Sequence, residues 1–238
     1  WRKYFLKICG HYFNLTSCIL YQKNFMNHIL HLSKDKKFKN LIESQEIFVL
    51  EKRNKVYLRL CSSILSQQLS TTVAKVLYKR FLALYNDKEP TVKQILETPL
   101  ETFRSIGFSN AKASYVHNVC RFFIGHKITD AQLHKMDNDE IIQLLTQIKG
   151  VGKWTVEMIL MFTLGREDVF ALDDLGLKHG VIKLYNLKET DKKLLQKKIE
   201  TISLKWRPYR TYASRYLWNW KDDAPLPDKK DNPKSKKQ

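Results

Sequence analysis

The sequence predicts an all-α fold, and three observations support this prediction. Glycine (8 residues) and proline (6 residues) are scarce among the 238 residues, and both disfavour the interior of a helix. Apolar residues recur at intervals of three and four along several segments, which is the helical spacing. No segment alternates apolar and polar residues convincingly enough to predict a sheet. The length allows one compact domain with a sizeable core, or two small lobes that share a cleft.

The helical pattern becomes strong at Val56. Both VYLRLCSSILSQQLS, which begins there, and the following TTVAKVLYKRFLALY repeat apolar residues at three and four. We expect Thr71 or Thr72 to cap the second of these helices. The stretch 89–123 predicts short helices separated by prolines and a glycine, with Ser109 as the cap of the longest one.

The later segments continue the helical set. The stretch DNDEIIQLLTQI (137–148) predicts a compact amphipathic helix whose acidic first turn suits the helix dipole. Residues 166–185 predict a loop that enters a helix, and 189–206 and 209–220 complete the set. The apolar run EIFVLEK (46–52) is expected to be an extended connector.

The two ends of the chain are treated separately. The chain begins at Trp1, and Met26 is a plausible start, so residues 1–25 form an N-terminal extension of uncertain role. Residues 26–222 are the expected folded domain. The proline-rich, charged stretch 223–238 has no apolar face and predicts a disordered basic tail.

The charge of the chain indicates a polyanionic partner. Lys and Arg total 42 against 24 for Asp and Glu, which gives a formal net charge of +18. Such an excess favours nucleic acid first and an anionic membrane second. No apolar run approaches the length of a membrane span, and no basic amphipathic helix carries large exposed aromatic residues, so we expect no membrane partner.

We expect a cytoplasmic, DNA-associated protein of a prokaryote. The first residues lack a proper apolar centre and a cleavage site, so a secretion signal is not expected. The four cysteines, Cys9, Cys18, Cys61 and Cys120, are widely spaced and match neither a zinc knuckle nor an iron–sulfur quartet. Reduced thiols in a cytosolic protein are the simplest interpretation.

A glycine-containing turn interrupts helical sequence in QIKGVGKWTVEMILMF (147–162). A tight turn between two helices is usually structural. However, the first helix is expected to end near Ile148 and the second to begin at about Val151. The second helix would start with backbone N–H groups that face out of a turn almost without side chains, and such a helix start binds anions. Lys153 adds positive charge. In a chain with this charge, we expect a DNA phosphate to bind, without regard to base sequence, at Gly150, Val151, Gly152 and Lys153.

Four segments in order carry a resemblance to a known family: SSILSQQLS, LLTQIKGVGKWTVEMILMF, DVFALDDLGLKHG and WRPYRTYASRYLW. Together they resemble the helix-hairpin-helix base-excision DNA glycosylases, and within that superfamily the AlkA-like 3-methyladenine DNA glycosylase II group. The resemblance extends from about Val56 to Trp220. It implies a helix-hairpin-helix DNA glycosylase fold of two helical lobes with a central cleft, with the hairpin at about 141–164.

The resemblance implies that Asp174 is the catalytic residue. Cleavage of an N-glycosidic bond builds positive charge on the sugar, which a carboxylate stabilises while it orients or deprotonates the attacking water. By the residues alone, Asp173 and Asp174 could both be carboxylates at a helix N-terminus. We expect Asp173 to be the helix cap and Asp174 to act in catalysis.

The resemblance also implies a monofunctional enzyme. Related bifunctional enzymes carry a Schiff-base lysine two residues after the second glycine of the hairpin, and here that position is Trp154. Lys153 lies one residue too early and points about 100° away on a helix. We therefore expect water to be the nucleophile, without a lyase step, and an abasic site to be the product.

The lesion pocket and the intercalating residue also follow from the resemblance. Trp154 and Trp218 match aromatic residues that line the pocket, where indoles suit positively charged alkylated purines; packing in the core is the alternative for Trp154. Met158 stands where a family member has tyrosine, which changes the shape of the pocket. Gln68 matches the intercalating position and Gln67 is expected to support the turn, against the alternative of polar residues at a helix end.

No cofactor is expected to be required. Members of the superfamily often hold a monovalent cation on carbonyl oxygens of the hairpin, here those of Thr146, Ile148 and Val151, so Na⁺ or K⁺ is a candidate. Lys112 is either a phosphate contact or a residue on a solvated face.

The sequence therefore predicts a monomeric, monofunctional DNA glycosylase for base excision repair. It would flip alkylated purines, such as 3-methyladenine, out of damaged double-stranded DNA and hydrolyse the N-glycosidic bond. One alternative is a related glycosylase for deaminated or mismatched bases. The other is a helix-hairpin-helix DNA-binding protein without catalysis, which would bind DNA in a salt-dependent way and release no base.

Overall fold

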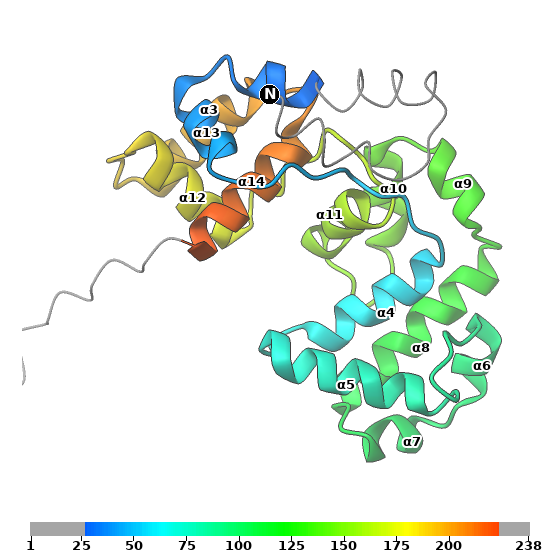
Figure 1. The fold of residues 1–238 in the computed structure, drawn as a ribbon. Coiled ribbons are helices and arrows are strands. Elements are labelled where there is room, and N and C mark those ends of the chain that lie inside the picture. The colour runs from blue at the N-terminus through cyan, green and yellow to red at the C-terminus, as the bar shows by residue number, and fades with distance from the viewer. Residues whose placement is uncertain (1–26, 224–238) are drawn as a thin grey trace, which may run out of the picture. The chain divides into compact units, whose positions relative to one another are not determined.

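The computed structural model describes residues 27–223, and the side chains as far as Trp220. The described residues form helices, turns and loops without a strand (Figure 1), so the predicted all-α class is confirmed. After a helical stretch at 27–32, the helices are α3 (Lys36–Glu43), α4 (Val56–Ser66), α5 (Thr71–Ala83), α6 (Val92–Glu97), α7 (Leu100–Ser105), α8 (Asn110–Gly125), α9 (Asp130–Lys135), α10 (Asn138–Leu145), α11 (Lys153–Phe162), α12 (Leu175–Tyr185), α13 (Lys192–Leu204) and α14 (Arg210–Asp223).

The chain divides into two compact units, as the two-lobe prediction requires. The central unit consists of Phe48–Asp173 and Pro208–Thr211. The terminal unit consists of the described residues up to Ile47, Asp174–Arg207 and the chain from Tyr212 onwards. The predicted cleft between the lobes stays a prediction. No helix within 27–223 is both long and apolar enough to cross a bilayer.

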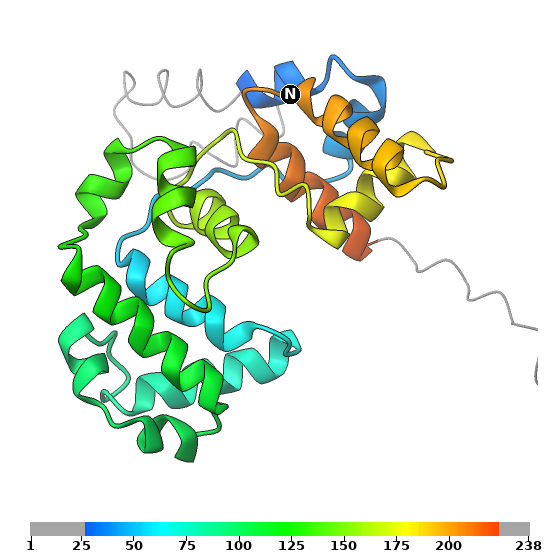
Figure 2. The same ribbon diagram turned by 180° about the vertical axis from the view of Figure 1, so that it is seen from behind.

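Helix α4 is the core of the central unit. Six of its residues are buried, Val56, Leu58, Leu60, Cys61, Ile64 and Leu65, and it packs against α5, α8 and α11. Helix α8 packs in turn on α6 and α7 (Figure 2). Cys61 and Cys120 are buried, free thiols in this core, as expected, whereas Cys9 and Cys18 lie outside the described residues. This packing fixes the loop at the C-terminal end of α4 against the start of α8.

The start of α4 is held by a residue far away in the sequence. Lys55 adopts a left-handed conformation (φ 62°) and gives α4 no side-chain cap. Instead, the carboxylate of Asp130 accepts hydrogen bonds from the backbone N–H groups of Lys55 (2.6 Å) and Val56 (3.0 Å). A carboxylate at this place satisfies N–H groups that the helix itself leaves open. Asp130 thus ties α9 to α4.

Aromatic packing builds the terminal unit. The ring of Trp206 is 1% exposed and lies 5.0 Å from the ring of Phe38 on α3. Tyr212 is buried and stacks on His28 at 3.8 Å. Burial lowers the pKa of His28 to about 4, which keeps this side chain neutral in the core at neutral pH. Trp206 and Tyr212 are therefore packing residues of the terminal unit.

Several helix boundaries differ from the sequence prediction. Ser70, and not Thr71 or Thr72, caps α5, because its side chain accepts the N–H of Val73. Ser109 caps α8 as predicted. The helices around the glycine turn were expected to meet near residues 148 and 151, but the turn is longer: α10 ends at Leu145 and α11 begins at Lys153.

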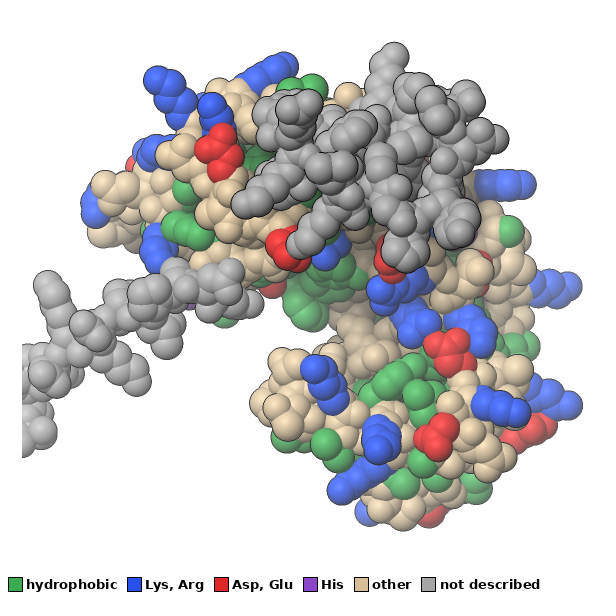
Figure 3. All heavy atoms as spheres, in the orientation of Figure 1, with side chains coloured by type: hydrophobic (Ala, Val, Ile, Leu, Met, Phe, Trp, Pro, Cys, Tyr) green, Lys and Arg blue, Asp and Glu red, His purple; other side chains and the backbone are tan. Residues whose placement is uncertain are grey.

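The ends of the chain leave the terminal predictions open. Residues 1–25 and almost all of the tail lie outside the described residues. Helix α14 reaches Asp223, which is the residue at which the tail was expected to begin. On the face drawn in Figure 3, Lys and Arg side chains are interspersed with Asp and Glu side chains.

Replacement of Asp130 by alanine tests the tie between α9 and α4. It removes an ionised acceptor from two backbone N–H groups, so we expect the free energy of unfolding to fall by about 2 kcal/mol. Asp139→Ala, in the exposed first turn of α10, is the control, with an expected change of about 0.5 kcal/mol or less. Urea titrations measure both. Equal losses in the two variants would contradict the role of Asp130.

Candidate functional site

The glycine turn lies in a helical hairpin of the central unit, formed by α10 and α11, which pack against each other. A reciprocal pair of hydrogen bonds between Asp137 and Glu140 starts α10. Between the helices, the N–H of Val151 donates to the carbonyl of Ile148 at 2.9 Å, and Gly150 turns the chain with a φ of 103°. Such a backbone angle strongly favours glycine.

Gly150 is also required by its neighbour on α8. A Cβ atom at this position would lie 2.3 Å from Cγ of Tyr115, far inside van der Waals contact. Two amide side chains hold the turn in place: Asn118 donates to the carbonyl of Lys149, and Gln67 donates to the carbonyl of Gly150, both at 3.3 Å. Gln67 therefore supports the turn, as the sequence predicted.

Helix α11 starts without a side-chain cap. Gly152 is its N-cap and is extended (φ −92°, ψ 167°), which is why the helix begins only at Lys153. A Cβ atom on Gly152 would meet nothing within 4 Å, so the helix start opens onto an accessible surface. Backbone N–H groups of such a start can bind a phosphate. The binding of phosphate by Gly150, Val151, Gly152 and Lys153 stays a prediction.

Lys153 is exposed but does not stand alone. Its ammonium lies 3.8 Å from a carboxylate oxygen of Glu157, one turn along α11, whose side chain is only 8% exposed. Part of the charge of Lys153 is therefore balanced by a carboxylate of its own helix. Lys153 can contribute a weaker attraction for a phosphate than an isolated lysine would.

Trp154 and Met158 lie one turn apart on α11 and so share one face of this helix. The side chain of Trp154 is 43% exposed, which excludes the alternative that it is a core residue. Met158 is half-buried. An exposed indole with a flexible thioether beside it offers an apolar surface for a planar ligand.

Gln68 lies at the tip of the loop between α4 and α5. It is exposed and has a positive φ of 59°, which is uncommon for a residue with a side chain. It lies two residues beyond the end of α4 at Ser66, so it is a loop residue. A strained, exposed polar residue is a candidate for function, and its intercalating role stays a prediction.

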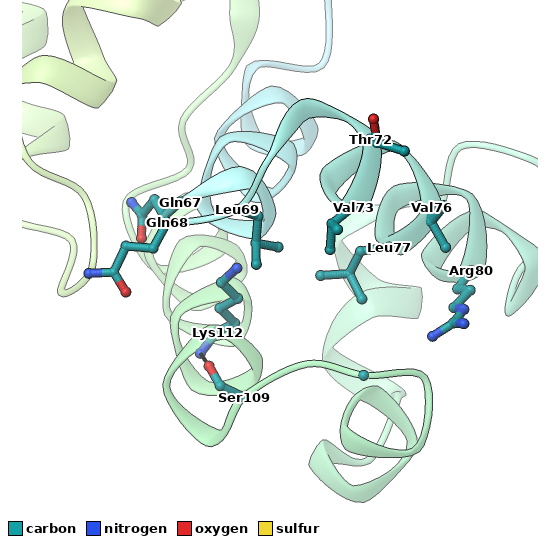
Figure 4. A pocket seen from close by; sticks show the side chains of 11 residues that line it. Gln67, Gln68, Leu69, Thr72, Val73, Val76, Leu77, Arg80, Ser109 and Lys112 are labelled. Carbon is teal, nitrogen blue, oxygen red and sulfur yellow. Dashed lines mark hydrogen bonds between the residues drawn. The ribbon is translucent and has the colours of Figure 1, made fainter. Parts of the chain in front are cut away.

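A groove of about 550 Å³ adjoins this loop. Gln67 and Gln68 lie at one end of the residues drawn in Figure 4 and Arg80 at the other. Lys112 lines the groove but donates from Nζ to the carbonyl of Leu65 at 2.7 Å, and burial lowers its pKa. Lys112 is thus neither a residue on a solvated face nor an uncommitted cation, because it binds the C-terminal turn of α4.

The terminal unit contains the predicted catalytic carboxylate. Asp174 is the N-cap of α12: its Oδ1 accepts the N–H of Leu177 at 2.7 Å. The same oxygen accepts the indole N–H of Trp218, on α14, at 2.9 Å. The expectation that Asp173 is the cap is therefore wrong, because the chain turns into the helix one residue later. Asp173 is exposed.

The structure thus distributes the predicted site residues over both units. Asp174 and Trp218 meet in the terminal unit, whereas Trp154, Met158, Gln68 and the glycine turn belong to the central unit. Sequence reasoning missed Tyr115 and Asn118, which lie against the turn, and Gly176, where an added Cβ atom would crowd Asp174 and Trp218. A glycine in the first turn of a helix, where it is unfavourable, was the available signal for Gly176.

One family model and several known proteins are similar to this chain. The model of the family described as HhH-GPD superfamily base excision DNA repair protein matches residues 61–204. DNA-3-methyladenine glycosylase 1 of Schizosaccharomyces pombe is 36% identical over 164 residues, which cover 68% of this chain and 71% of that protein. The putative DNA-3-methyladenine glycosylase YfjP of Bacillus subtilis is 30% identical over 203 residues, which cover 82% and 69%.

Solved structures of 3-methyladenine DNA glycosylases are also similar to this chain. The 3-methyladenine DNA glycosylase Mag1 of Schizosaccharomyces pombe, in complex with abasic DNA, superposes with a TM-score of 0.73 and 32% identity, over 83% of this chain and 97% of that one. A DNA-3-methyladenine glycosidase of Bacillus halodurans superposes with a TM-score of 0.71 and 32% identity, over 81% and 88%.

The two hairpin glycines make a matched pair of variants. Gly150→Ala places a methyl group against Tyr115 at a positive φ, so we expect a loss of about 3 kcal/mol or more of unfolding free energy. Gly152→Ala meets open space and changes only a helix cap, so we expect a loss of about 1 kcal/mol or less. Thermal unfolding followed by circular dichroism compares them. Equal stability of the two variants would refute this account of the turn.

Proposed function

The chain belongs to the HhH-GPD superfamily of base excision DNA repair proteins, and we propose that it is a monofunctional DNA glycosylase that excises alkylated purines, such as 3-methyladenine, from damaged duplex DNA. Relatives named DNA-3-methyladenine glycosylase from yeast and bacteria support this substrate class. The observation that carries the proposal is the pairing of Asp174 with Trp218 on one carboxylate oxygen, which joins a negative charge to an aromatic ring.

Asp174 supplies the chemistry in this proposal. As the bond between base and sugar breaks, the sugar gains positive charge, and a fixed carboxylate stabilises that charge without having to reorganise. The same group orients or deprotonates the water that attacks the sugar. Two N–H donors hold Asp174 in place, from Leu177 and Trp218, which suits it to this work better than a freely rotating side chain would be.

The absence of a lyase step follows from Trp154. The position of the Schiff-base lysine in bifunctional relatives holds an indole, which cannot form an imine. The neighbouring Lys153 lies about 100° away around the helix and within 3.8 Å of the Glu157 carboxylate. Water therefore attacks the sugar, and the DNA strand stays intact at an abasic site.

Recognition of the lesion falls to the aromatic residues. The exposed indole of Trp154 and the ring of Trp218 attract a base that carries positive charge, through stacking and cation–π interaction. Met158 adapts its shape to the base. Gln68 fills the space that the extracted base leaves in the duplex. A single chain carries all these groups, so we propose a monomer.

The hairpin anchors the DNA in this account. The uncapped start of α11 binds one phosphate next to the lesion. A bound Na⁺ or K⁺ fits the same turn, because carbonyl oxygens are the ligands that such cations prefer. The carbonyl of Ile148 accepts one hydrogen bond, from Val151, and keeps a second lone pair. The carbonyls of Thr146, Ile148 and Val151 would hold the ion, whose charge would help to neutralise the phosphate.

Two related functions remain to be separated from this one. Because Met158 alters the pocket, a preference for deaminated or mismatched bases is a specific alternative. A DNA-binding protein without catalysis is the other. Relatives occur in fission yeast, budding yeast and bacteria, so the cytoplasmic, prokaryotic setting inferred from the sequence stays a prediction.

A panel of duplexes tests the proposed function. Methylated DNA, a duplex with hypoxanthine and a duplex with uracil are incubated with the protein, and the released bases are identified by mass spectrometry. We expect 3-methyladenine to be released fastest. Faster release of hypoxanthine or uracil would favour the alternative glycosylase, and binding without release of any base would favour the non-catalytic protein.

Asp174→Asn is the matched control for the panel. The amide oxygen can still accept from Leu177 and Trp218, so the local structure should persist while the negative charge is lost. We expect the variant to bind DNA as tightly as the wild type. Its rate of base release should fall by a factor of about 100 or more. Full activity in this variant would show that Asp174 is not the catalytic residue.

A further inference from the structure

The indole of Trp218 has two different surfaces, an edge that carries the N–H group and a π face. Its N–H lies in the plane of the ring and points at Oδ1 of Asp174, at 2.9 Å. The π face is perpendicular to that bond. A single indole can therefore bind the carboxylate with its edge and a base with its face. The contact with Asp174 is a second task, different from the pocket role implied by the family resemblance.

The hydrogen bond determines how the carboxylate is oriented. Within α12, the backbone N–H of Leu177 donates to Oδ1 at 2.7 Å. This is the ordinary hydrogen bond of an N-cap. One bond leaves the carboxylate able to rotate about χ2, which is a soft torsion. The indole reaches the same oxygen from α14, a separate element. Two donors from two separate elements therefore hold Oδ1 of Asp174.

Gly176 makes room for this contact. A Cβ atom at this position would lie 3.1 Å from Oδ1 of Asp174, and 3.2 Å from both Cδ1 and Nε1 of Trp218. These distances are shorter than ordinary van der Waals contacts, and the atoms involved are those of the hydrogen bond itself. With a larger residue here, the carboxylate or the indole must shift by a few tenths of an ångström, so we expect the contact between them to be disturbed.

The next glycine on α12 provides a contrast. At Gly180 a Cβ atom would meet Cβ and Cδ2 of Leu217 at 3.4 Å, which is close to ordinary packing. Helices α12 and α14 lie side by side in both ribbon views. Glycine at both positions lets the helices approach, but only Gly176 touches the carboxylate and the indole.

We propose that Trp218 and Gly176 are positioning residues for Asp174. The indole N–H fixes the rotation of the carboxylate, and Gly176 leaves the space in which that bond forms. This inference rests on the proposed catalytic role of Asp174 and deepens it. It assigns to Trp218 an effect on the rate of bond cleavage that is separate from any effect on base binding.

Trp218→Phe tests the indole N–H. Phenylalanine keeps an aromatic face but has no donor, so kcat for the release of 3-methyladenine should fall about 10- to 100-fold. KM and the affinity for DNA should stay within about twofold, because the face that contacts the base remains. A loss confined to KM, with kcat unchanged, would show that Trp218 only binds the base and would overturn the proposal.

Gly176→Ala and Gly180→Ala form the matched pair. Both replace a helical glycine by the same residue on the same helix, so both favour the helix. Gly176→Ala should lower kcat about tenfold or more without lowering the melting temperature. Gly180→Ala should keep the kcat of the wild type. Equal kcat values for the two variants would contradict the role of Gly176.

The double variant separates positioning from packing. If Gly176 acts through Trp218, then Gly176→Ala should cost little further activity once Trp218→Phe has removed the N–H. If the fold-loss of activity in the double variant equals the product of the fold-losses in the two single variants, the two residues act independently. That result would refute the proposed link.

An NMR measurement separates this inference from the proposed function. The chain has five tryptophans, so the indole ¹H–¹⁵N resonance of Trp218 can be assigned from Trp218→Phe. It should shift in Gly176→Ala and Asp174→Asn, and stay in place in Gly180→Ala. A protein that shows these shifts but releases no base would lack the proposed function; one that releases base without the shifts would lack the positioning contact.

Discussion

In the terminal unit, a single carboxylate oxygen, Oδ1 of Asp174, accepts hydrogen bonds from two different helices. Oδ1 of Asp174 accepts one of the N–H groups that the first turn of α12 leaves open, that of Leu177, and the indole N–H of Trp218 on α14. The same contact therefore starts a helix, connects it to another helix and holds a negative charge in a defined direction. Gly176 is the steric condition for this contact. A charge that is fixed before the reaction stabilises a developing cation better than one that must reorganise.

In the central unit, the glycine turn leaves backbone N–H groups open at the start of α11, which is the arrangement proposed to bind a DNA phosphate. Gly150 turns the chain against Tyr115, where no side chain fits, and Gly152 leaves the start of α11 open. The amides of Gln67 and Asn118 hold the turn from α4 and α8. The turn and the loop with Gln68 thus share one support, since Gln67 precedes Gln68 in the chain. Asp130 stabilises the other end of α4.

The parts that could be predicted from the sequence are those with a local signal. Helical spacing predicted the fold class, and the two glycines and the basic charge marked the hairpin. The family motifs indicated Asp174 and Trp218. The wrong assignment of the cap to Asp173 has a local cause, since two adjacent carboxylates both suit a helix start and only backbone angles distinguish them. The pairing of Trp218 with Asp174, and of Gly150 with Tyr115, joins residues more than thirty positions apart, and no periodicity in the sequence reports such contacts.

The central claim is that a fixed carboxylate directs water to the sugar, and that no amine of the protein becomes linked to DNA. The most direct measurement is incubation of methylated duplex DNA with the wild-type protein in the presence of sodium borohydride, which reduces an imine to a stable bond. The account predicts released base, an unbroken strand with an abasic site, and no protein–DNA adduct. A borohydride-trapped adduct that disappears in Lys153→Ala, together with a broken strand, would contradict it.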